Sequence, residues 1–386
     1  MDGEVEATPT DFNNETVVFQ FMTKYIPCVR DGNRTQFDRN RKPQKEEMDN
    51  IQELSPELVN KVSHKRNVNV SMAGSKADYD RRDPDYQKAA DKQHSQAIVN
   101  GISRIGYQTG GKSALWTDEN FPYIFTEKAN SFIEKNKENP FFLFFSFHDI
   151  HVPRLPNKQF EGKSTMGPRG DAIVQMDWIT GQVIQKLEKL GLDKNTLVIF
   201  TSDNGPVLND GYEDLAVEKL GNHKPSGPFR GGKYSSFEAG TRVPMISYWP
   251  GTIKPGESNA LFSQIDYYAS LGNLVNQKIS KNEALDSKNI KNALLKADGK
   301  GRNLMLEEGF TLSIRDKNYK YIAPLQAKKF PKWLKNKKVE GGLSKNPQLY
   351  DLSIDKGEQN NIAKNHKNLV NKLQSKIDSI VAISLK

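Results

Sequence analysis

Two continuous apolar runs separated by a helical pattern occupy the middle of the chain. Residues 141–147 read FFLFFSF and residues 196–201 read TLVIFT. Such runs are typical of strands buried on both faces of a sheet. Between them, apolar residues recur at helical spacing over residues 171–190, and Gly191 follows as a helix end. Two buried strands joined by a helix predict a parallel, right-handed βαβ unit.

Further elements of the same kind flank this unit. Residues 118–137 have helical spacing and are stopped by Asn139-Pro140, because the residue before a proline disfavours the helical conformation. Residues 243–250 (VPMISYWP) predict another buried strand, and residues 264–274 a following helix. The region up to residue 284 is therefore predicted to be an α/β domain, with a mostly parallel sheet flanked by helices.

The pattern changes near residue 285. Residues 309–324 (GFTLSIRDKNYKYIAP) alternate about a polar turn and predict a β-hairpin. A last amphipathic helix follows, with Leu369, Leu373, Ile377 and Ile380 in phase. We expect residues 285–386 to form a small α+β domain with an antiparallel sheet.

The first hundred residues carry weaker signals. Residues 19–29 (FQFMTKYIPCV) are apolar and strand-like, but no strand and helix precede them. Residues 36–92 are polar and rich in charge, and we expect a long surface excursion there. Residues 97–116 are rich in glycine but lack the spacing of a phosphate-binding P-loop. The polar start of the chain is no secretory signal, and no apolar run is long enough to span a membrane, so no membrane partner is expected.

Composition narrows the class of partner. The chain has 386 residues, a net charge of +9 and a single cysteine, Cys28, which excludes an internal disulfide and a cysteine metal cluster. A basic excess attracts polyanions. No helix-turn-helix, zinc-finger or RNP-like pattern accompanies the charge, so nucleic acid is not expected as a partner. A sulfated polymer and a merely lysine-rich surface both remain open.

Candidate chemistry lies at the carboxyl ends of the two buried strands. Asp203 and Asn204 follow one strand, and His151 follows the other. Because parallel strands of a βαβ unit end at the same edge of the sheet, we expect these side chains to converge, where α/β sheets bind ligands. Carboxylate and amide oxygens suit a hard cation such as Ca²⁺, although Asp-Asn-Gly is also ordinary turn chemistry. About thirty residues later, Arg230 and Lys233 flank two glycines.

Taken in order, these motifs resemble the sulfatase family of the alkaline-phosphatase-like superfamily. The resemblance rests on Ser-Asp-Asn-Gly at 202–205, on Gly-Gly-Lys-Tyr-x-x-Phe-Glu-Ala-Gly at 231–240 and on Leu-Tyr-Asp-Leu at 349–352. It implies that Asp203 and Asn204 bind calcium and that Lys233 holds the sulfate group.

The same resemblance implies further site residues and a substrate class. His151 aligns with the family's catalytic histidine, and we expect His223 and Arg230 to contact the substrate. The implied activity is hydrolysis of aryl or carbohydrate sulfate esters, so the expected partner is a sulfated small molecule or glycan.

Part of the family pattern is not found in this sequence. Sulfatases carry paired metal-binding aspartates and a Cys-x-Pro-Ser-Arg run whose cysteine becomes formylglycine. Cys28 is followed by Val-Arg-Asp instead. The chain therefore resembles an N-terminally truncated sulfatase, expected to be inactive alone and to bind Ca²⁺ weakly or not at all. The resemblance suggests a periplasmic or secreted location for the full-length form.

Three interpretations remain at this point. The chain is a sulfatase without its N-terminal segment, a non-catalytic remnant that binds sulfated glycan, or a related phosphoesterase. Lys233 within Gly-Gly-Lys and the Leu-Tyr-Asp-Leu run favour a sulfatase over a phosphoesterase. The sequence gives no indication of oligomeric state.

Overall fold

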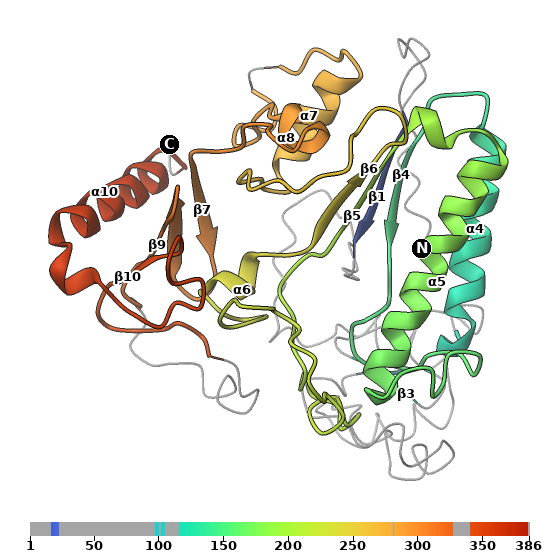
Figure 1. Ribbon diagram of the computed structural model, residues 1–386, viewed down its shortest axis with the longest axis horizontal. Helices are drawn as coiled ribbons and strands as arrows, with labels where there is room; N and C mark the ends of the chain where they lie inside the picture. Colours follow the sequence, from blue (N-terminus) through green and yellow to red (C-terminus); the bar gives the residue numbers. More distant parts are fainter. Residues whose placement is uncertain are drawn as a thin grey trace, which may run out of the picture.

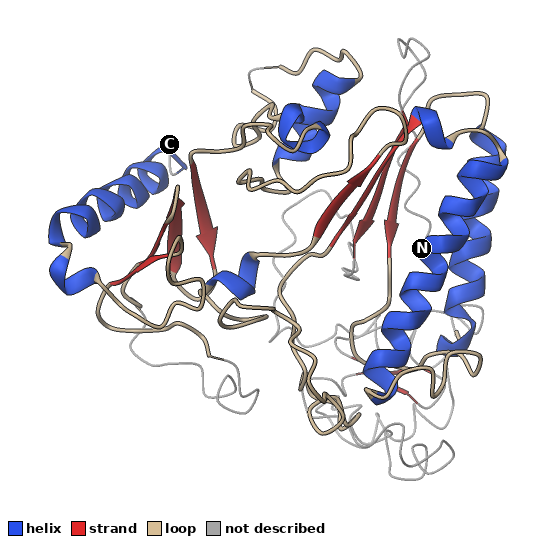
Figure 2. Cartoon of the chain, in the orientation of Figure 1, coloured by secondary structure: helices blue, strands red, loops and turns tan. Residues whose placement is uncertain are grey.

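The computed structural model describes residues 17–22, 97–99, 102–104, 116–280, 282–326 and 340–384. The described residues contain two four-stranded sheets with their own helices (Figures 1 and 2), and a short two-stranded sheet formed by residues 97–99 and 102–104. The expected excursion at 36–92 and most of the apolar run at 19–29 lie outside the described residues.

The first sheet has four described strands in the order β4-β1-β5-β6. Their bounds are β1 Val17–Met22, β4 Phe142–Ser146, β5 Thr196–Thr201 and β6 Met245–Tyr248. Strand β1 is parallel to both β4 and β5, whereas β6 is antiparallel to β5. The sheet is therefore mixed and mostly parallel, as the sequence predicts.

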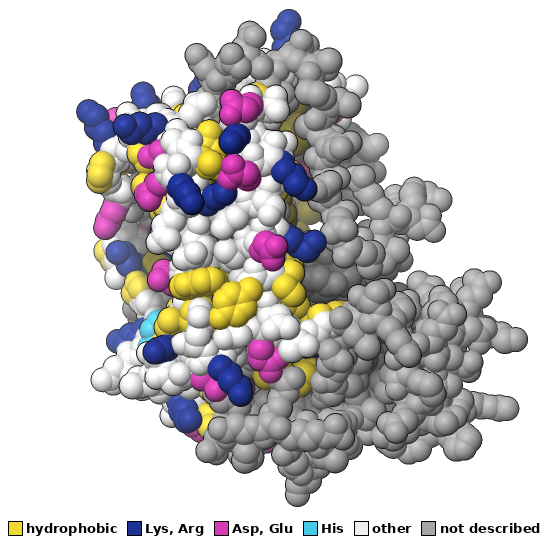
Figure 3. Space-filling view, turned by 90° about the vertical axis from the view of Figure 1, so that its right-hand side faces the viewer, with side chains coloured by type: hydrophobic (Ala, Val, Ile, Leu, Met, Phe, Trp, Pro, Cys, Tyr) yellow, Lys and Arg dark blue, Asp and Glu magenta, His cyan; other side chains and the backbone are white. Residues whose placement is uncertain are grey.

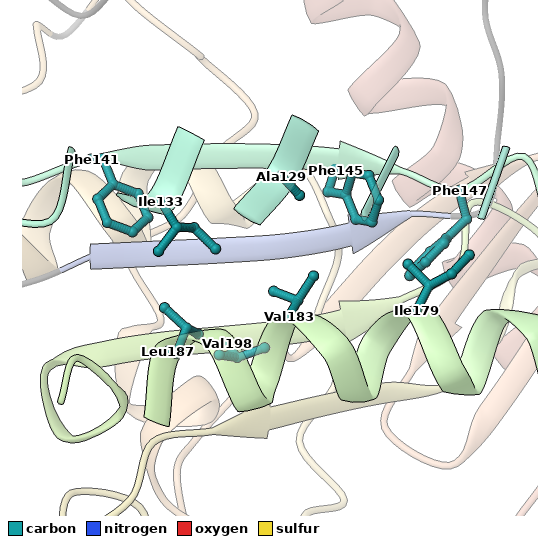
Figure 4. Close-up of a cluster of buried hydrophobic side chains, with 9 residues drawn as sticks. All are labelled: Ala129, Ile133, Phe141, Phe145, Phe147, Ile179, Val183, Leu187 and Val198. Atoms are coloured by element: carbon teal, nitrogen blue, oxygen red, sulfur yellow. The ribbon is translucent and has the colours of Figure 1, made fainter. Parts of the chain in front are cut away.

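Helices α4 (Phe121–Asn136) and α5 (Gly167–Lys189) cover one face of this sheet (Figure 1). Their apolar stripes meet the inward side chains of β4 and β5 in one core, shown in Figure 4. Ile133, Val183 and Leu187 are at most 1% exposed in this core. Burying each such side chain contributes about 1.5–3 kcal/mol, so this layer fixes the helices and the strand ends that follow them.

The two central strands predicted from the apolar runs are not neighbours. Strand β1 lies between β4 and β5, so β4 is at the edge of the described strands. The prediction that residues 141–147 are buried on both faces is therefore wrong, because Phe142 and Phe144 are each 50% exposed. The same applies to β6, where Ile246 is 58% exposed. An apolar run reports hydrophobicity, but the position of a strand in the sheet decides how much of it is covered.

The opposite face of the sheet carries α7 (Asp266–Leu274) and α8 (Lys291–Leu295). Leu294 packs with Leu197 and Ile199 of β5 and with Tyr267 of α7. This packing places α8 with the first sheet. The domain boundary expected near residue 285 stays a prediction.

The C-terminal part contains an antiparallel sheet in the order β10-β9-β8-β7. Its elements are β7 Leu304–Glu308, β8 Leu312–Asp316, β9 Tyr319–Ile322, β10 Gln348–Asp351 and α10 Lys367–Ser384. The predicted hairpin is confirmed as β8–β9, and the final helix as α10. Leu373 and Ile377 of α10 pack on Ile314 and Tyr321 of the sheet.

Short elements complete the described chain. They are β2 Ala97–Val99, β3 Ile102–Arg104, α6 Glu238–Thr241 and the 3-10 turns Asp118–Asn120, Asp193–Asn195 and Ala363–Asn365. A buried ion pair between Arg104 and Asp118 ties β3 to the start of α4. No helix within the described ranges has the length and apolar character of a membrane span.

Figure 3 shows the outer surface of the α4 and α5 side. Basic and acidic side chains are interspersed there, with a group of hydrophobic side chains among them. Tyr123 and Val174 of these helices are 41% and 36% exposed. On this face, the positive charge of the chain is not gathered into a single basic patch.

Candidate active site

A cavity of about 410 Å³ lies beyond the carboxyl ends of β4 and β5. Its wall is formed by the chain after β4, helix α5, the chain after β5, the basic loop before α6 and the chain between α6 and β6. His151, Asp203, Asn204 and Lys233 all contribute to its wall. The structure thus brings together four of the six predicted site residues, because parallel strands end at one edge even when another strand lies between them.

Lys233 is at the centre of a polar network in this cavity. Its ammonium nitrogen lies 2.7 Å from Oδ2 of Asp210 and 3.1 Å from Nε2 of His151. The hydroxyl of Tyr234 donates to the other oxygen of Asp210 at 2.9 Å. Asp210 is 1% exposed, so its charge is held in a low-dielectric setting and orients Lys233 strongly.

The contacts of His151 fix its tautomer. Its Nδ1 lies 2.7 Å from the carbonyl oxygen of Val152, which can only accept a hydrogen bond. Nδ1 therefore carries the proton, and Nε2 accepts from Lys233. Burial and the nearby charge of Lys233 lower the pKa of His151 to about 4. The imidazole is consequently neutral at pH 7.

Asp203 and Asn204 begin the turn after β5 and line the cavity. The amide nitrogen of Asn204 donates to the carbonyl of Gly205 at 3.1 Å, which leaves the amide oxygen as the atom suited to a cation. Within the described ranges, no three or more acidic, histidine or cysteine side chains form a metal-binding group. The two residues have the oxygen chemistry of a Ca²⁺ site, but they supply only part of the six to eight ligands that Ca²⁺ takes.

Two glycines hold the loops of the site against each other. Gly205 donates to the carbonyl of Gly240 at 3.0 Å, and a Cβ at Gly205 would lie 1.6 Å from the carbonyl oxygen of Ala239. Likewise, a Cβ at Gly232 would lie 2.3 Å from the carbonyl oxygen of Pro206. Because glycine lacks a Cβ, the turn bearing Asp203 and the loop bearing Lys233 pack backbone to backbone.

The other two predicted site residues lie outside the cavity wall. His223 is exposed. Arg230 forms an ion pair with Glu340, donates to the carbonyl of Glu358 at 2.8 Å and stacks over the ring of Phe237. In this structure Arg230 ties the basic loop to the C-terminal part of the chain, and the substrate-binding role expected of it and of His223 stays a prediction.

The C-terminal sheet fixes the basic loop through buried charges. The backbone N–H of Glu238 donates to Oε2 of Glu358 at 2.6 Å, and Arg315 of β8 lies 2.7 Å from Oε1 of Glu238. Lys320 of β9, fully buried, pairs with Glu307 and lies 3.9 Å from Glu238. The position of the loop that bears Lys233 therefore depends on residues of the C-terminal part of the chain, far away in the sequence.

Sequence reasoning missed several residues of the site. Asp210 is one of four acidic residues in the segment after the Asp-Asn turn, with Glu213, Asp214 and Glu218, and the sequence pattern does not single it out. Arg154 and Arg169 were missed as well, and both line the cavity. Arg154 pairs with Asp214 at 2.5 Å and thereby joins the segment after β4 to the segment after β5. An arginine three residues beyond the candidate histidine was the available signal for it.

Comparison with known proteins identifies relatives of this chain. An N-acetylgalactosamine-6-O-sulfatase of Bacteroides thetaiotaomicron is 48% identical over 289 residues, which are 74% of this chain and 56% of that protein. A steryl-sulfatase of Rattus norvegicus is 37% identical over 169 residues, 44% of this chain and 29% of its own length. The chain thus spans less than two thirds of the curated relatives it matches.

Solved structures give the same result. A Bacteroides thetaiotaomicron protein, solved in work on the metabolism of multiple glycosaminoglycans, superposes with a TM-score of 0.70 at 49% identity, over 74% of this chain and 59% of its own. The sulfatase PsFucS1 of Pseudoalteromonas superposes with a TM-score of 0.58 at 25% identity, over 71% and 56%. A family model described as Sulfatase matches residues 59–277, more than half of the chain. With its alkaline-phosphatase-like α/β fold, the chain therefore belongs to the sulfatase family.

Proposed function

We propose that this protein acts in the hydrolysis of sulfate esters, with a 6-O-sulfated N-acetylhexosamine of a glycan as substrate. The observation that carries the proposal is the partly buried ammonium of Lys233, held between Asp210 and His151 in the cavity wall. The substrate class follows from the relative that shares 48% identity over 74% of this chain.

Lys233 is the group that binds the sulfate. An ammonium has three hydrogens to donate. Asp210 accepts one and Nε2 of His151 accepts another, so the third is directed to an oxygen of the ester. A charge-assisted hydrogen bond of this kind is short and about twice as strong as a neutral one. Asp210 holds the ammonium in place before the substrate arrives, which is the preorganisation that catalysis requires.

His151 acts beside Lys233 on the leaving-group side. Its neutral ring presents the Nε2 lone pair to the Lys233 ammonium, while Nδ1 is fixed by Val152. As negative charge develops on the ester oxygen, the hydrogen bond that Lys233 donates to it strengthens. The hydrogen bonds from Lys233 to His151 and Asp210 respond to this change, because hydrogen-bonded groups polarise one another. The two side chains therefore act as a unit, and changing either one alters the other.

Two further groups of the family bear on the reaction. Asp203 and Asn204 would hold a calcium ion, which when bound offsets the charge of the sulfate oxygens. Formylglycine has no counterpart in these 386 residues, because Cys28 lacks the required context and no Cys-x-Pro-Ser-Arg run occurs. We infer that the chain by itself binds the sulfate group without turning it over.

The experiment measures binding, so it does not depend on turnover. Calorimetric titration of the full chain compares 6-O-sulfo-N-acetylgalactosamine with the unsulfated sugar, in wild type and in Lys233→Ala. We expect the sulfated sugar to bind more tightly and Lys233→Ala to reduce that affinity at least tenfold. The exposed residue Lys254 gives a matched control, and Lys254→Ala should leave the affinity unchanged. Equal binding by wild type and Lys233→Ala would overturn the proposal, and tighter binding of inorganic phosphate than of sulfate would favour a phosphoesterase.

A further inference from the structure

Arg169 lines the same cavity as Lys233 and is 3% exposed. It stands in the first turn of α5, on the helix face that also brings Met176 to the cavity wall. An arginine that is almost completely buried requires a counter-charge or a full set of hydrogen-bond acceptors.

Among the described residues, the structure gives the guanidinium of Arg169 no ion pair and an incomplete set of hydrogen bonds. Its Nε and Nη1 are buried without a hydrogen-bond partner. Burial and the neighbouring charge of Arg154 lower its pKa to about 10, which leaves it charged at neutral pH. A buried charge whose donors are unused is costly to the folded protein, unless a ligand completes it.

Asp214, the carboxylate whose charge acts on Arg169, is already neutralised by another arginine. Asp214 pairs with Arg154 at 2.5 Å, and its other oxygen accepts from the backbone N–H of Ala216. The remaining donors of Arg154 reach the carbonyls of Ile150 and Val207. The pair formed by Arg154 and Asp214 is therefore satisfied and leaves Arg169 in excess.

The other cations of the cavity wall have their own acidic partners. Lys233 pairs with Asp210, and Arg242 lies 3.1 Å from Glu238. Arg169 is thus the cation of the described cavity wall for which the structure gives no ion pair. An anion in the cavity would balance it.

The position of Arg169 in α5 adds to this requirement. The amino end of a helix carries a partial positive charge, so a cation in the first turn is unfavourable there and an anion is favourable. The residue before the helix, Met166, makes no capping hydrogen bond through its side chain. A ligand anion beside Arg169 would interact with both the guanidinium and the helix end.

We propose that Arg169 is a second anion-binding position of the cavity, which recognises a negative group of the substrate other than the sulfate held by Lys233. That group is a carboxylate or a second sulfate on the same or the adjoining sugar, so the preferred ligand is a polyanionic glycan. This inference rests on the proposed function, because it presumes that Lys233 holds the first sulfate.

The test uses the full chain and three ligands. One is 6-O-sulfo-N-acetylgalactosamine, the second is its disaccharide with a uronic acid, and the third is the 4,6-disulfated sugar. Affinities are measured by calorimetry for wild type, Arg169→Gln and Arg169→Lys, with Lys254→Gln as the exposed control. Thermal melts verify that each variant is folded.

We expect wild type to bind one of the two doubly charged ligands roughly ten- to a hundredfold more tightly than the monosulfated sugar, as a charge-assisted hydrogen bond predicts. Arg169→Gln should weaken binding of the preferred doubly charged ligand at least tenfold more than binding of the monosulfated sugar, whereas Arg169→Lys should keep part of the preference. If Arg169→Gln loses affinity for the uronate ligand alone, the group bound by Arg169 is a carboxylate. If it loses affinity for the disulfated ligand alone, the group is a second sulfate.

Two outcomes would overturn the inference. One is a wild-type protein that prefers neither doubly charged ligand, a result that needs no variant to fold. The other is Arg169→Gln weakening all three ligands equally, which would give Arg169 only a structural role. The proposed function fails separately, when Lys233→Ala retains full affinity for the monosulfated sugar.

Discussion

Replacing Lys320 with methionine tests how the buried charges of the C-terminal sheet stabilise the loop of the candidate site. Lys320 is 0% exposed, and its ammonium forms an ion pair with Glu307 and lies 3.9 Å from Glu238. Burial alone would lower the pKa of Lys320, but Glu307 and Glu238 outweigh it and raise the pKa. Methionine keeps most of the apolar stem of the side chain, so Lys320→Met removes mainly the charge.

The expected cost follows from the group left behind. Breaking a buried ion pair by removing one partner typically costs about 3–5 kcal/mol. The protein has an alternative, which is to bind a proton on the abandoned glutamate. For an ordinary glutamate that step costs about 4 kcal/mol at pH 7 and about 1 kcal/mol at pH 5. The destabilisation by Lys320→Met should therefore fall from about 3–4 kcal/mol at pH 7 to about 1 kcal/mol at pH 5.

Urea unfolding followed by circular dichroism at the two pH values gives both numbers. The double variant Lys320→Met/Glu307→Gln should recover most of the stability at pH 7 and lose the pH dependence, because no unpaired charge remains. Lys376→Met is the control for a more exposed ion pair. Lys376 pairs with the carboxylate of Asp316, but its side chain is 35% exposed. The loss in the free energy of unfolding should therefore stay below about 1 kcal/mol.

Equal destabilisation of the protein by Lys320→Met at pH 5 and pH 7 would contradict this prediction. So would a double variant that is no more stable than the single one at pH 7. Either result would mean that Lys320 contributes through packing and not through its charge.

Three further predictions concern the same loops. Burial raises the pKa of Glu358 to about 7, so the stability it contributes is complete below about pH 4.5 and is lost as the pH rises through 7. Glu358→Gln should therefore raise the melting temperature at pH 8, with a gain of up to about 3 kcal/mol in the free energy of unfolding, and should change neither quantity near pH 4. A loss of stability at pH 8 would contradict this. Gly205→Ala should cost about 1–3 kcal/mol and weaken sulfate binding, whereas the control Gly181→Ala, with open space around its Cβ in α5, should be neutral or stabilising. His151, whose pKa is lowered to about 4, should show a neutral ring protonated at Nδ1 in nitrogen NMR spectra at pH 6, and an imidazolium signal there would refute the assignment.

The sequence by itself determined the secondary structure of the middle and end of the chain and the convergence of the site. Apolar periodicity located β4, α5, β5, the β8–β9 hairpin and α10, because burial of one face imposes that period on the residues. The meeting of His151 with Asp203 followed from strand polarity alone. It holds in the structure even though β1 lies between the two strands.

Only the tertiary structure decided which residues are neighbours. The central place of β1, the half-exposed Phe142 and Phe144, and the packing of α8 on the first sheet depend on contacts that no local pattern contains. The same is true of the chemistry around Lys233. Asp210 reaches it across 23 positions, and the loop that carries Lys233 is fixed by side chains of the C-terminal sheet. Side-chain pairing is set by how loops fold on one another, and a residue's type and spacing along the chain carry no record of that.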